Sequence, residues 1–278
     1  RHPRAPEGPA AWLDLAGALA AAQEGAAARA ALGHVETNYA GQIWSERAAL
    51  KTIELDLAAG ERPQTLDRLQ ALATRRLAGE PMAYLTGEKA FHGLTLRVDA
   101  RVLDPRDDTE TLVDWALALL PRDAGRRVLD LGTGSGAIAL ALAAERPRAR
   151  VTAAGARADA LAVAAGKAAR LGGGLDLRHG DWFGPLADER FDLIVSNPPY
   201  IAADDPHLPA LSHEPRQALV SGADGLHDIR RIIAAAPEHL APGAWLLLEH
   251  GWDQAAAVRD LLGAAGFMQA QSRRELAG

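Results

Sequence analysis

The chain has 278 residues and no cysteine. Without cysteine there is no disulfide, thiolate zinc site, iron–sulfur cluster or cysteine nucleophile. No uninterrupted apolar run is long enough to span a membrane, so we expect no membrane partner. The nine histidines are scattered and no His-x-x-x-His spacing occurs, so we expect no metal ion.

Positive charge is also scarce. The chain has 30 lysines and arginines against 36 aspartates and glutamates, a net charge of -6. Nucleic acids are bound largely through cationic side chains, so we expect no direct binding of DNA. A hydrophobic content of 48% with 24% charged residues is typical of a folded chain, and the length fits about two domains. Residues 1–9 lack the basic-then-apolar order of a signal peptide, so we expect a cytoplasmic protein.

The first part of the chain has a helical pattern. Apolar residues recur three and four apart over residues 10–80, which predicts about three helices, with a break at residues 60–64 and a cap at Gln64 or Thr65. Residues 83–98 then alternate in polarity, which predicts a β-hairpin turning at residues 87–89. We therefore expect a helical domain at 1–82, a hairpin linker at 83–106 and a larger domain at 107–278. The apolar positions are Trp12, Leu13, Leu15, Leu19, Ile43, Leu50, Ile53, Leu55, Leu57, Leu66, Leu69, Leu72 and Leu77.

Strands and helices alternate in the larger domain. This order predicts an α/β fold with a mostly parallel sheet that is covered on both faces, and ligands at the carboxyl ends of its strands. The predicted strands are 127–131, 150–154, 175–178, 191–196 and 244–249. The predicted helices are 112–120, 137–144, 158–171, 225–240 and 253–265.

A glycine-rich turn follows the first of these strands. Gly132, Gly134 and Gly136 allow a ligand to approach exposed backbone N–H groups where a side chain would clash. Three interpretations remain open at this point: a tight turn without a ligand, a dinucleotide site, and the loop that holds the amino-acid half of S-adenosylmethionine. Asp130 favours the third, because a carboxylate attracts an ammonium group and repels a pyrophosphate.

A second motif, Asn-Pro-Pro-Tyr, follows the strand at 191–196. The prolines fix the backbone, so the carbonyls of Asn197 and Pro198 can accept hydrogen bonds from one planar NH2 group, while Tyr200 offers a ring face for packing. The alternative is a proline-rich turn that only closes the strand. Because the carboxyl ends of parallel strands share one edge of a sheet, we expect this turn beside the glycine loop and predict a site for an amide or amino nitrogen.

Together these motifs resemble those of class I methyltransferases that modify exocyclic or amide nitrogens. More narrowly, the chain is similar to the release factor glutamine methyltransferases of the HemK/PrmC family from about residue 40 to its end. The further segments that carry this similarity are 75–87, 102–110, 180–183, 213–215 and 247–251. The resemblance implies a Rossmann-like fold whose mostly parallel sheet has seven strands or lacks the last of them.

The resemblance also implies an activity, a cofactor and a site. The activity is methyl transfer from S-adenosylmethionine to the glutamine amide of the Gly-Gly-Gln motif in class-1 peptide chain release factors, with the helical domain gripping that protein substrate. The glycine loop would wrap the methionine part of the cofactor and Trp182 would lie by its adenine. The implied cofactor-binding residues are Asp130, Gly132, Thr133, Gly134, Ser135, Gly136, Gly155, Asp181, Trp182 and Asn197. The implied catalytic residues are Asn197, Pro198, Pro199 and Tyr200.

Three departures from the family pattern stand out. Gly155 occupies the place of an acidic residue that would accept hydrogen bonds from the cofactor's ribose, and we interpret Asp159 as an ordinary acid of an early helical turn, so we expect weakened cofactor binding. Asp104 and Asp107 replace Ile and Pro, and Ala90 replaces Glu, which puts substrate docking there in doubt, although Asp107, Asp108 and Thr109 still supply caps for the next helix. Relatives continue past the place of residue 278 into another strand, whose absence would leave a sheet edge unpaired.

Two alternatives to glutamine methylation remain. Adenine amino methylation of DNA would use the same chemistry, but the net charge and the lack of a separate basic recognition region disfavour it. A protein that binds release factors without methylating them would follow if Gly155 abolishes cofactor binding. We expect a monomer in either case.

Overall fold

The protein is described by a computed structural model. The described residues are 13, 15–17, 19–20, 25–38, 51–52, 63–171 and 174–273. The chain divides into two compact units, Arg1–Leu85 and Thr86–Gly278. The domain boundaries predicted after residues 82 and 106 stay predictions.

The first unit is mostly helical where it is described. It contains α2 (Gly25–Asn38) and α4 (Pro63–Leu77), and residues 13, 15–17 and 19–20 are helical as well. A small buried cluster joins these helical residues and is formed by Ala16, Ala31, Leu32 and Val35. The predicted helical pattern at residues 43–57, apart from residues 51–52, lies outside the described residues, as does the start of the predicted break at residue 60.

One detail of this unit differs from the prediction. Helix α4 begins at Pro63, so Gln64 and Thr65 lie inside its first turn and neither is its cap. Proline suits the first helical turn because its fixed φ is already helical and its missing N–H would have no partner there. The proline therefore starts the helix that it was expected to precede.

The hairpin forms, but its turn lies later than predicted. Tyr84 and Leu85 belong to the short helix α5 (Met82–Thr86), and the antiparallel strands are β1 (Glu88–Phe91) and β2 (Leu94–Arg97). The two residues between the strands, His92 and Gly93, have φ of 45° and 74°. Such left-handed pairs make the tight turns whose twist matches a hairpin, so the turn at residues 87–89 was wrong.

The second unit is built on a sheet of five parallel strands in the order β5-β4-β3-β6-β7. The strands are β3 (Arg127–Leu131), β4 (Arg150–Gly155), β5 (Asp176–His179), β6 (Phe191–Ser196) and β7 (Leu240–Leu248). Strands β3 and β6 are mostly apolar and are buried along most of their length, which is typical of a parallel sheet covered on both faces.

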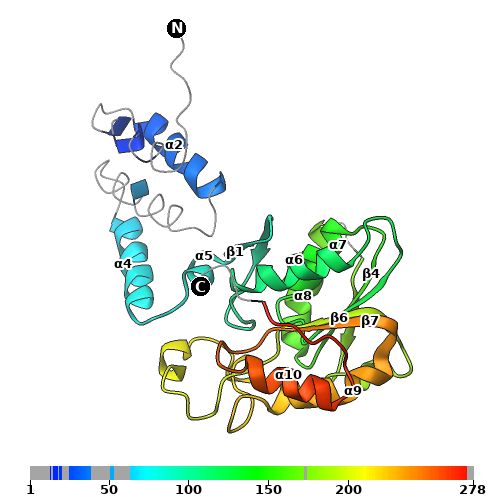
Figure 1. Cartoon of the computed structure of the whole chain (residues 1–278). Helices are drawn as coiled ribbons and strands as arrows, with labels where there is room; N and C mark the ends of the chain where they lie inside the picture. The colour runs from blue at the N-terminus through cyan, green and yellow to red at the C-terminus, as the bar shows by residue number, and fades with distance from the viewer. Residues whose placement is uncertain are drawn as a thin grey trace. The chain divides into compact units, whose positions relative to one another are not determined.

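Helices cover both faces of this sheet (Figure 1). In the figure α6 and α7 pack together on one face, and α9 and α10 pack together on the other. The bounds are α6 (Thr109–Leu119), α7 (Ala137–Glu145), α8 (Ala158–Leu171), α9 (His227–His239) and α10 (Ala255–Ala264). The sequence Ala-Ile-Ala-Leu-Ala-Leu at the start of α7 is buried throughout, so that helix is held by packing on all sides.

The predicted α/β class and the helical coverage are confirmed, but the seven-stranded sheet is wrong for the described residues. Their parallel sheet has five strands, and residues 267–273, after α10, form none. That segment, Phe-Met-Gln-Ala-Gln-Ser-Arg, is mostly polar and has no β-branched residue, so it lacks the pattern of a strand. Residues 274–278 lie outside the described residues.

The strand order places the functional motifs together. Strand β3 has β4 on one side and β6 on the other, so the order of the sheet reverses at its carboxyl end. In open α/β sheets ligands bind at such a reversal. The glycine loop follows β3 and the Asn-Pro-Pro-Tyr turn follows β6, so both reach this point.

Candidate functional site

A cavity of about 450 Å³ opens at the carboxyl ends of β3, β4 and β6. That volume lies within the range of about 300–1,000 Å³ that is usual for small-molecule sites. The predicted site residues that line it are Gly132, Thr133, Gly134, Ser135, Gly155, Asp181, Trp182, Asn197 and Pro199. Four others, Asp130, Gly136, Pro198 and Tyr200, are not among the lining residues.

The glycine loop is held by its own backbone. The N–H groups of Gly132 and Thr133 both donate to the carbonyl of Ala154 at 2.9 Å, and the N–H of Gly136 donates to Thr133 at 2.7 Å. The N–H groups of Gly132, Thr133 and Gly136 are therefore already used within the protein. The N–H groups of Gly134 and Ser135 make no hydrogen bond with a described residue, which leaves these two for a ligand.

Gly136 serves packing rather than ligand contact. Its φ is +79°, and a Cβ at this position would lie 2.8 Å from the Cβ of Ala164 in α8. Only glycine permits this backbone and this approach of the helix. Below the loop, the buried Lys167 ammonium donates to the carbonyl of Ser135 at 2.8 Å, and burial lowers the pKa of this lysine to about 8.

Asp130 lies beneath the loop, at the end of β3. Its Oδ2 accepts hydrogen bonds from Thr133 Oγ1 at 2.6 Å and from the N–H of Ala139 at 3.1 Å, while its buried Oδ1 has no partner among the described residues. Burial raises the pKa of this carboxyl to about 6, against the lowering by those two hydrogen bonds. The orphaned oxygen suits an ammonium group, and the contact itself stays a prediction.

Trp182 stands over the loop. A Cβ on Gly132 would lie 3.1 Å from its ring, and its own φ is +44°. The indole Nε1 donates to Asp228 Oδ1 at 3.2 Å, and Asp228 Oδ2 accepts from Ser221 Oγ at 2.8 Å. Trp182 also packs against the core cluster around Leu131, so it is both a cavity wall and a part of the core.

The Asn197 amide is oriented by the first residue of α6. Its Nδ2 donates to Thr109 Oγ1 at 3.0 Å, and Thr109 is buried. This hydrogen bond fixes the amide so that its carbonyl oxygen stays available as an acceptor. The strand before it is tied to β3, because Ser196 Oγ donates to the carbonyl of Leu131 at 2.5 Å. The two motifs are thus joined at their bases, as predicted.

Tyr200 turns away from the cavity. Its hydroxyl donates to Glu249 Oε1 at 3.2 Å, and its ring packs against the apolar cluster that includes Leu226 and Ile229 of the α9 region. Its carbonyl accepts from Gln254 Nε2 at 3.0 Å, and Gly225, with φ of +72°, passes so close that a Cβ would lie 2.2 Å from it. The tyrosine therefore anchors the turn, and its predicted contact with a substrate stays a prediction.

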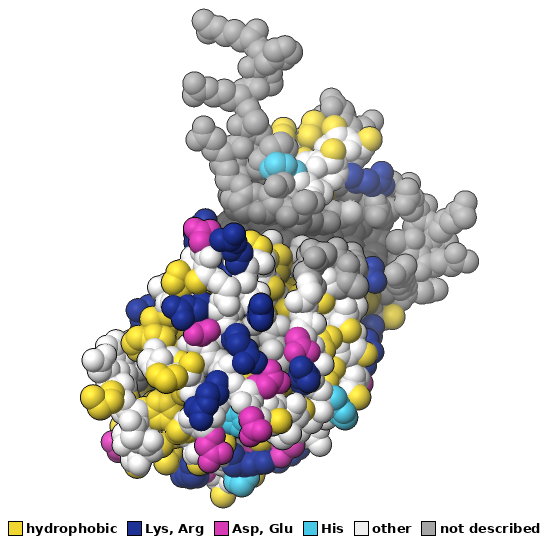
Figure 2. Space-filling view, turned by 90° about the vertical axis from the view of Figure 1, so that its right-hand side faces the viewer, with side chains coloured by type: hydrophobic (Ala, Val, Ile, Leu, Met, Phe, Trp, Pro, Cys, Tyr) yellow, Lys and Arg dark blue, Asp and Glu magenta, His cyan; other side chains and the backbone are white. Residues whose placement is uncertain are grey.

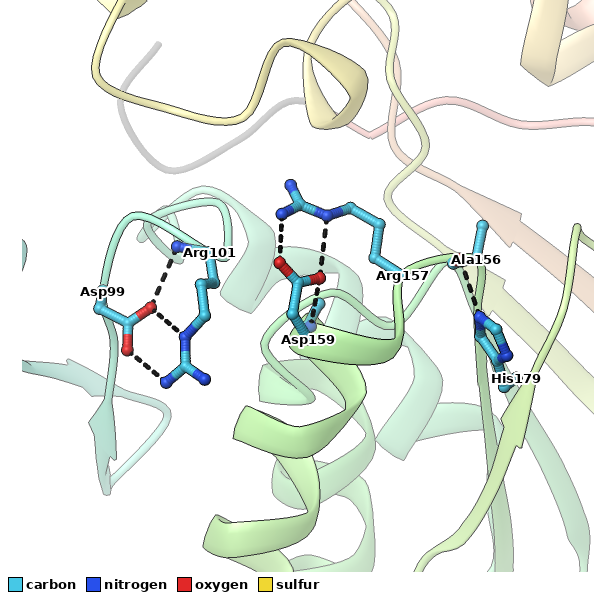
Figure 3. Close-up of polar contacts among 7 residues, drawn as sticks. Asp99, Arg101, Ala156, Arg157, Asp159 and His179 are labelled. Carbon is cyan, nitrogen blue, oxygen red and sulfur yellow. Dashed lines mark hydrogen bonds and ion pairs between the residues drawn. The ribbon is translucent and has the colours of Figure 1, made fainter.

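Gly155 lines the cavity without a carboxylate of its own, and the nearby Asp159 is not among the described lining residues. Asp159 lies in the first turn of α8, where it pairs with Arg157 at 2.5 Å, and this arginine lowers its pKa. The interpretation of Asp159 as an acid of an early helical turn is confirmed. The described cavity lining here includes Arg101 and Arg157 instead (Figure 3).

Several lining residues were missed from the sequence. The hairpin and the segment after it supply one wall, and the segment 215–218 supplies another. The signal was available, because 102–110 and 213–215 carried the resemblance although no site role was assigned to them. The missed lining residues include Phe91, Arg101, Val102, Pro105, Thr109, Arg157, Pro215, Gln217 and Asp228.

The second family departure has a structural account. Asp107 pairs with Lys89 at 2.9 Å on the strand that also carries Ala90. Asp104 is buried, and its burial raises its pKa. Asp108 occupies the N-cap position of α6 but its side chain makes no capping hydrogen bond and its backbone is already helical, so the predicted side-chain cap is wrong.

The described surface and helices were compared with the features of nucleic-acid, membrane and metal sites. On the face drawn in Figure 2 basic and acidic side chains intermingle rather than gather into one basic area. Within the described ranges, no helix is long and apolar enough to cross a bilayer, and no group of three or more histidines, aspartates or glutamates could hold a metal ion.

Comparison with known proteins gives close matches over most of the chain. Residues 109–265 match the sequence family described as the methyltransferase small domain. The chain is 54% identical to the release factor glutamine methyltransferase of Bordetella pertussis over 210 residues, covering 74% of this chain and 78% of that protein. It is 52% identical to the protein of the same name from Xylella fastidiosa, covering 76% and 78%.

A solved structure supports the fold. The chain superposes on the hMettl16 catalytic domain, solved in complex with the MAT2A 3'UTR hairpin 6, with a TM-score of 0.52 and 18% identity. The match covers 66% of this chain and 73% of that one. At this identity the likeness is one of fold alone.

Proposed function

Because the chain belongs to the family of release factor glutamine methyltransferases, we propose that it methylates the glutamine of the Gly-Gly-Gln motif in class-1 peptide chain release factors. The methyl group comes from S-adenosylmethionine and goes to the side-chain amide nitrogen. The observation that carries the proposal is the meeting of Gly132 to Ser135 and Asn197 in one cavity, where a methyl donor and an amide acceptor would lie next to each other.

The cavity fits the cofactor at the loop. The left-handed glycines at 132 and 134 give a cradle where side chains would intrude, and Asp130 Oδ1 is a buried acceptor without a described partner. We infer that the loop holds the methionine part, with Asp181 and Trp182 at the adenine. The position of Gly155 fits less well, because glycine offers no carboxylate to the ribose.

The residues of this chain would act mainly by positioning the substrate. An amide nitrogen is a weak nucleophile because its lone pair is delocalised, so orientation matters more than a strong base. S-adenosylmethionine supplies a sulfonium methyl group, and a nitrogen–carbon bond forms as the carbon–sulfur bond breaks. Holding the nitrogen in line for this step can contribute about 7–11 kcal/mol.

Asn197 is the residue we assign to this orientation. Its carbonyl oxygen and that of Pro198 would accept the two N–H groups of the substrate glutamine, while Thr109 holds the Asn197 amide from behind. These acceptors gain strength as positive charge develops on the nitrogen, which then loses a proton to the solvent. Pro198 and Pro199 keep the turn rigid, and Tyr200 anchors its end.

We extend the proposal to the setting of the reaction. The helical unit, which lies before the matched residues 109–265, would contribute to gripping the release factor. We propose that the enzyme acts as a monomer in the cytoplasm, where its substrate works.

The test is transfer of label from S-adenosylmethionine to a purified release factor, repeated with the Gly-Gly-Gln glutamine replaced. We expect label only on the unaltered substrate, and label that persists on the replaced one would reject the assignment. In parallel, Asn197→Ala should abolish transfer and leave cofactor binding by calorimetry largely intact. Unchanged turnover of that variant would remove Asn197 from the mechanism.

A further inference from the structure

Two arginines line the cavity at the end where the family pattern has an acid. Arg101 follows β2, and Arg157 lies two residues after Gly155, just before α8. Both arginines line the cavity, and Asp159, the partner of Arg157, lies close enough to Arg101 to act on its charge. Figure 3 shows them with their partners, Asp99 and Asp159. The replacement of the acid is therefore accompanied by cationic side chains at the same place.

Each arginine is held by an aspartate two residues away. Arg101 donates from Nε and Nη2 to Asp99 at 2.9 and 2.7 Å, and Arg157 does the same to Asp159 at 3.1 and 2.5 Å. The remaining terminal nitrogen, Nη1, makes no hydrogen bond with a described residue in either arginine. Both guanidinium groups are thus fixed in direction and still have donors to offer.

The charge that faces the cavity is basic at this end. Arg101 and Arg157 are among the described lining residues, whereas Asp99 and Asp159 are not. Two aspartates line the cavity. Asp181 follows Gly180, whose N–H donates to the Gly155 carbonyl at 3.1 Å, and its carboxylate pairs with Arg231 at 2.5 Å. Asp228 accepts from the Trp182 indole. Near Gly155 the described lining therefore presents two guanidinium groups, and the neighbouring carboxylate of Asp181 is already paired with Arg231.

A third cation lies beneath. Lys167 is buried under the glycine loop, where its ammonium donates to the Ser135 carbonyl, and it is close enough to Asp99 to help lower the pKa of that carboxyl. Asp159 in turn lies close enough to Arg101 to raise the pKa of that arginine. These five side chains form one cluster of three cations, Arg101, Arg157 and Lys167, and two anions, Asp99 and Asp159.

The place of this cluster in the sheet is one where nucleotide-binding proteins recognise the ribose. In doubly wound sheets an acid after the second strand accepts hydrogen bonds from ribose hydroxyls, and an arginine nearby accommodates a phosphate on the ribose. Gly155 ends the second strand of this sheet along the chain, β4, and Arg157 follows two residues later. An acid here would repel a phosphate, whereas glycine leaves room for one.

We propose that this end of the cavity is an anion subsite, and that the protein binds adenosine carrying a phosphate on its ribose 2′ or 3′ oxygen in preference to adenosine. Such nucleotides would compete with S-adenosylmethionine and lower methyl transfer. The proposal rests on the proposed function, because it takes from it the direction in which the adenosine lies in the cavity.

The salt bridges do not prevent this binding. The side chains of the two ion pairs, Arg101 with Asp99 and Arg157 with Asp159, are between one third and about one half exposed. Ion pairs at such positions stabilise a protein little. A phosphate can also take the free Nη1 donors without displacing either aspartate. Planar guanidinium groups bind phosphate oxygens with short, charge-assisted hydrogen bonds.

The test uses calorimetry on the full chain with adenosine, adenosine 2′-monophosphate, adenosine 3′-monophosphate and S-adenosylmethionine. We expect at least one of the two phosphates to bind about tenfold more tightly than adenosine, to displace S-adenosylmethionine, and to lose this advantage at high salt. Arg157→Ala should remove the advantage, as should Gly155→Asp. The matched control is Arg178→Ala, because Arg178 pairs with Asp176 at the same spacing and does not line the cavity.

The outcomes separate this proposal from the proposed function. If adenosine binds as tightly as both phosphates, or if Arg157→Ala and Arg178→Ala lower the phosphate advantage equally, the anion subsite is wrong even though S-adenosylmethionine binds and transfer proceeds. If a phosphate binds with the expected advantage but no methyl reaches the Gly-Gly-Gln glutamine, the subsite stands and the proposed function fails. If none of the four ligands binds, both fail.

Discussion

Gly134 and Gly136 occupy the same turn with the same backbone requirement, so alanine substitutions there separate packing from ligand contact. Both have positive φ, +49° and +79°, which costs an alanine about 1–2 kcal/mol. At Gly136 the new Cβ would also lie 2.8 Å from the Cβ of Ala164, and overpacking of this kind costs about 1–3 kcal/mol more. At Gly134 the nearest atom is a carbonyl oxygen at 3.9 Å, so no such clash arises.

Gly136→Ala should therefore lower the free energy of unfolding by about 2–5 kcal/mol, and Gly134→Ala by about 1–2 kcal/mol. Gly134 lines the cavity and Gly136 does not, so Gly134→Ala should have the larger effect on cofactor binding. It should weaken the binding of S-adenosylmethionine by about tenfold or more. Urea denaturation measures the free energy of unfolding, and calorimetry measures the affinity for S-adenosylmethionine. Equal losses of stability, or a Gly134→Ala protein that binds S-adenosylmethionine normally, would refute this reasoning.

Three further predictions concern the same cavity. Thr109→Val removes the acceptor that orients Asn197 and should lower kcat about tenfold with cofactor affinity unchanged, whereas Thr109→Ser should retain activity; equal turnover in the two variants would exclude the positioning role. The pKa of Asp130 is raised to about 6, so the folded protein binds this proton more tightly than the unfolded chain and the free energy of unfolding should fall as the pH rises from about 4 to 6. Denaturation of Asp130→Asn should lack that part of the slope, and identical profiles would contradict the assignment. Gly155→Asp should tighten the binding of S-adenosylmethionine ten- to hundredfold in calorimetry, because the new carboxylate would accept hydrogen bonds from the ribose. The Cβ of the aspartate would lie 3.4 Å from Leu161, which is not a clash. No gain in affinity would reject the idea that this glycine weakens cofactor binding.

The middle of the sheet was predictable because strands β3 and β6 are buried along most of their length. The runs Arg127–Leu131 and Phe191–Ser196 are bounded by polar or turn residues, and the structure has them at the predicted residues. The bounds of α8 were also predicted, since a regular apolar spacing covers its whole length. The predicted position of the hairpin turn was wrong, because the glycines at 87 and 93 both have a left-handed backbone. Only the pairing of the two strands decides which of these glycines lies in the turn.

The site was only partly predictable, for a different reason. The glycine loop and Asn197 are motifs of local sequence, so they could be found and their meeting inferred from the order of a parallel sheet. Thr109 lies 88 residues before Asn197 and acts through a single hydrogen bond, which no local pattern encodes. The same holds for Asp228, which steadies Trp182 from a helix 46 residues further on.

The most direct test of the account is a crystal structure of the protein with S-adenosylhomocysteine and a peptide containing Gly-Gly-Gln. The account predicts the cofactor's amino-acid part against Gly132 to Ser135, with the glutamine amide nitrogen donating to Asn197 Oδ1 and facing the sulfur. A peptide glutamine bound away from Asn197, or a cofactor seated outside the glycine loop, would contradict it.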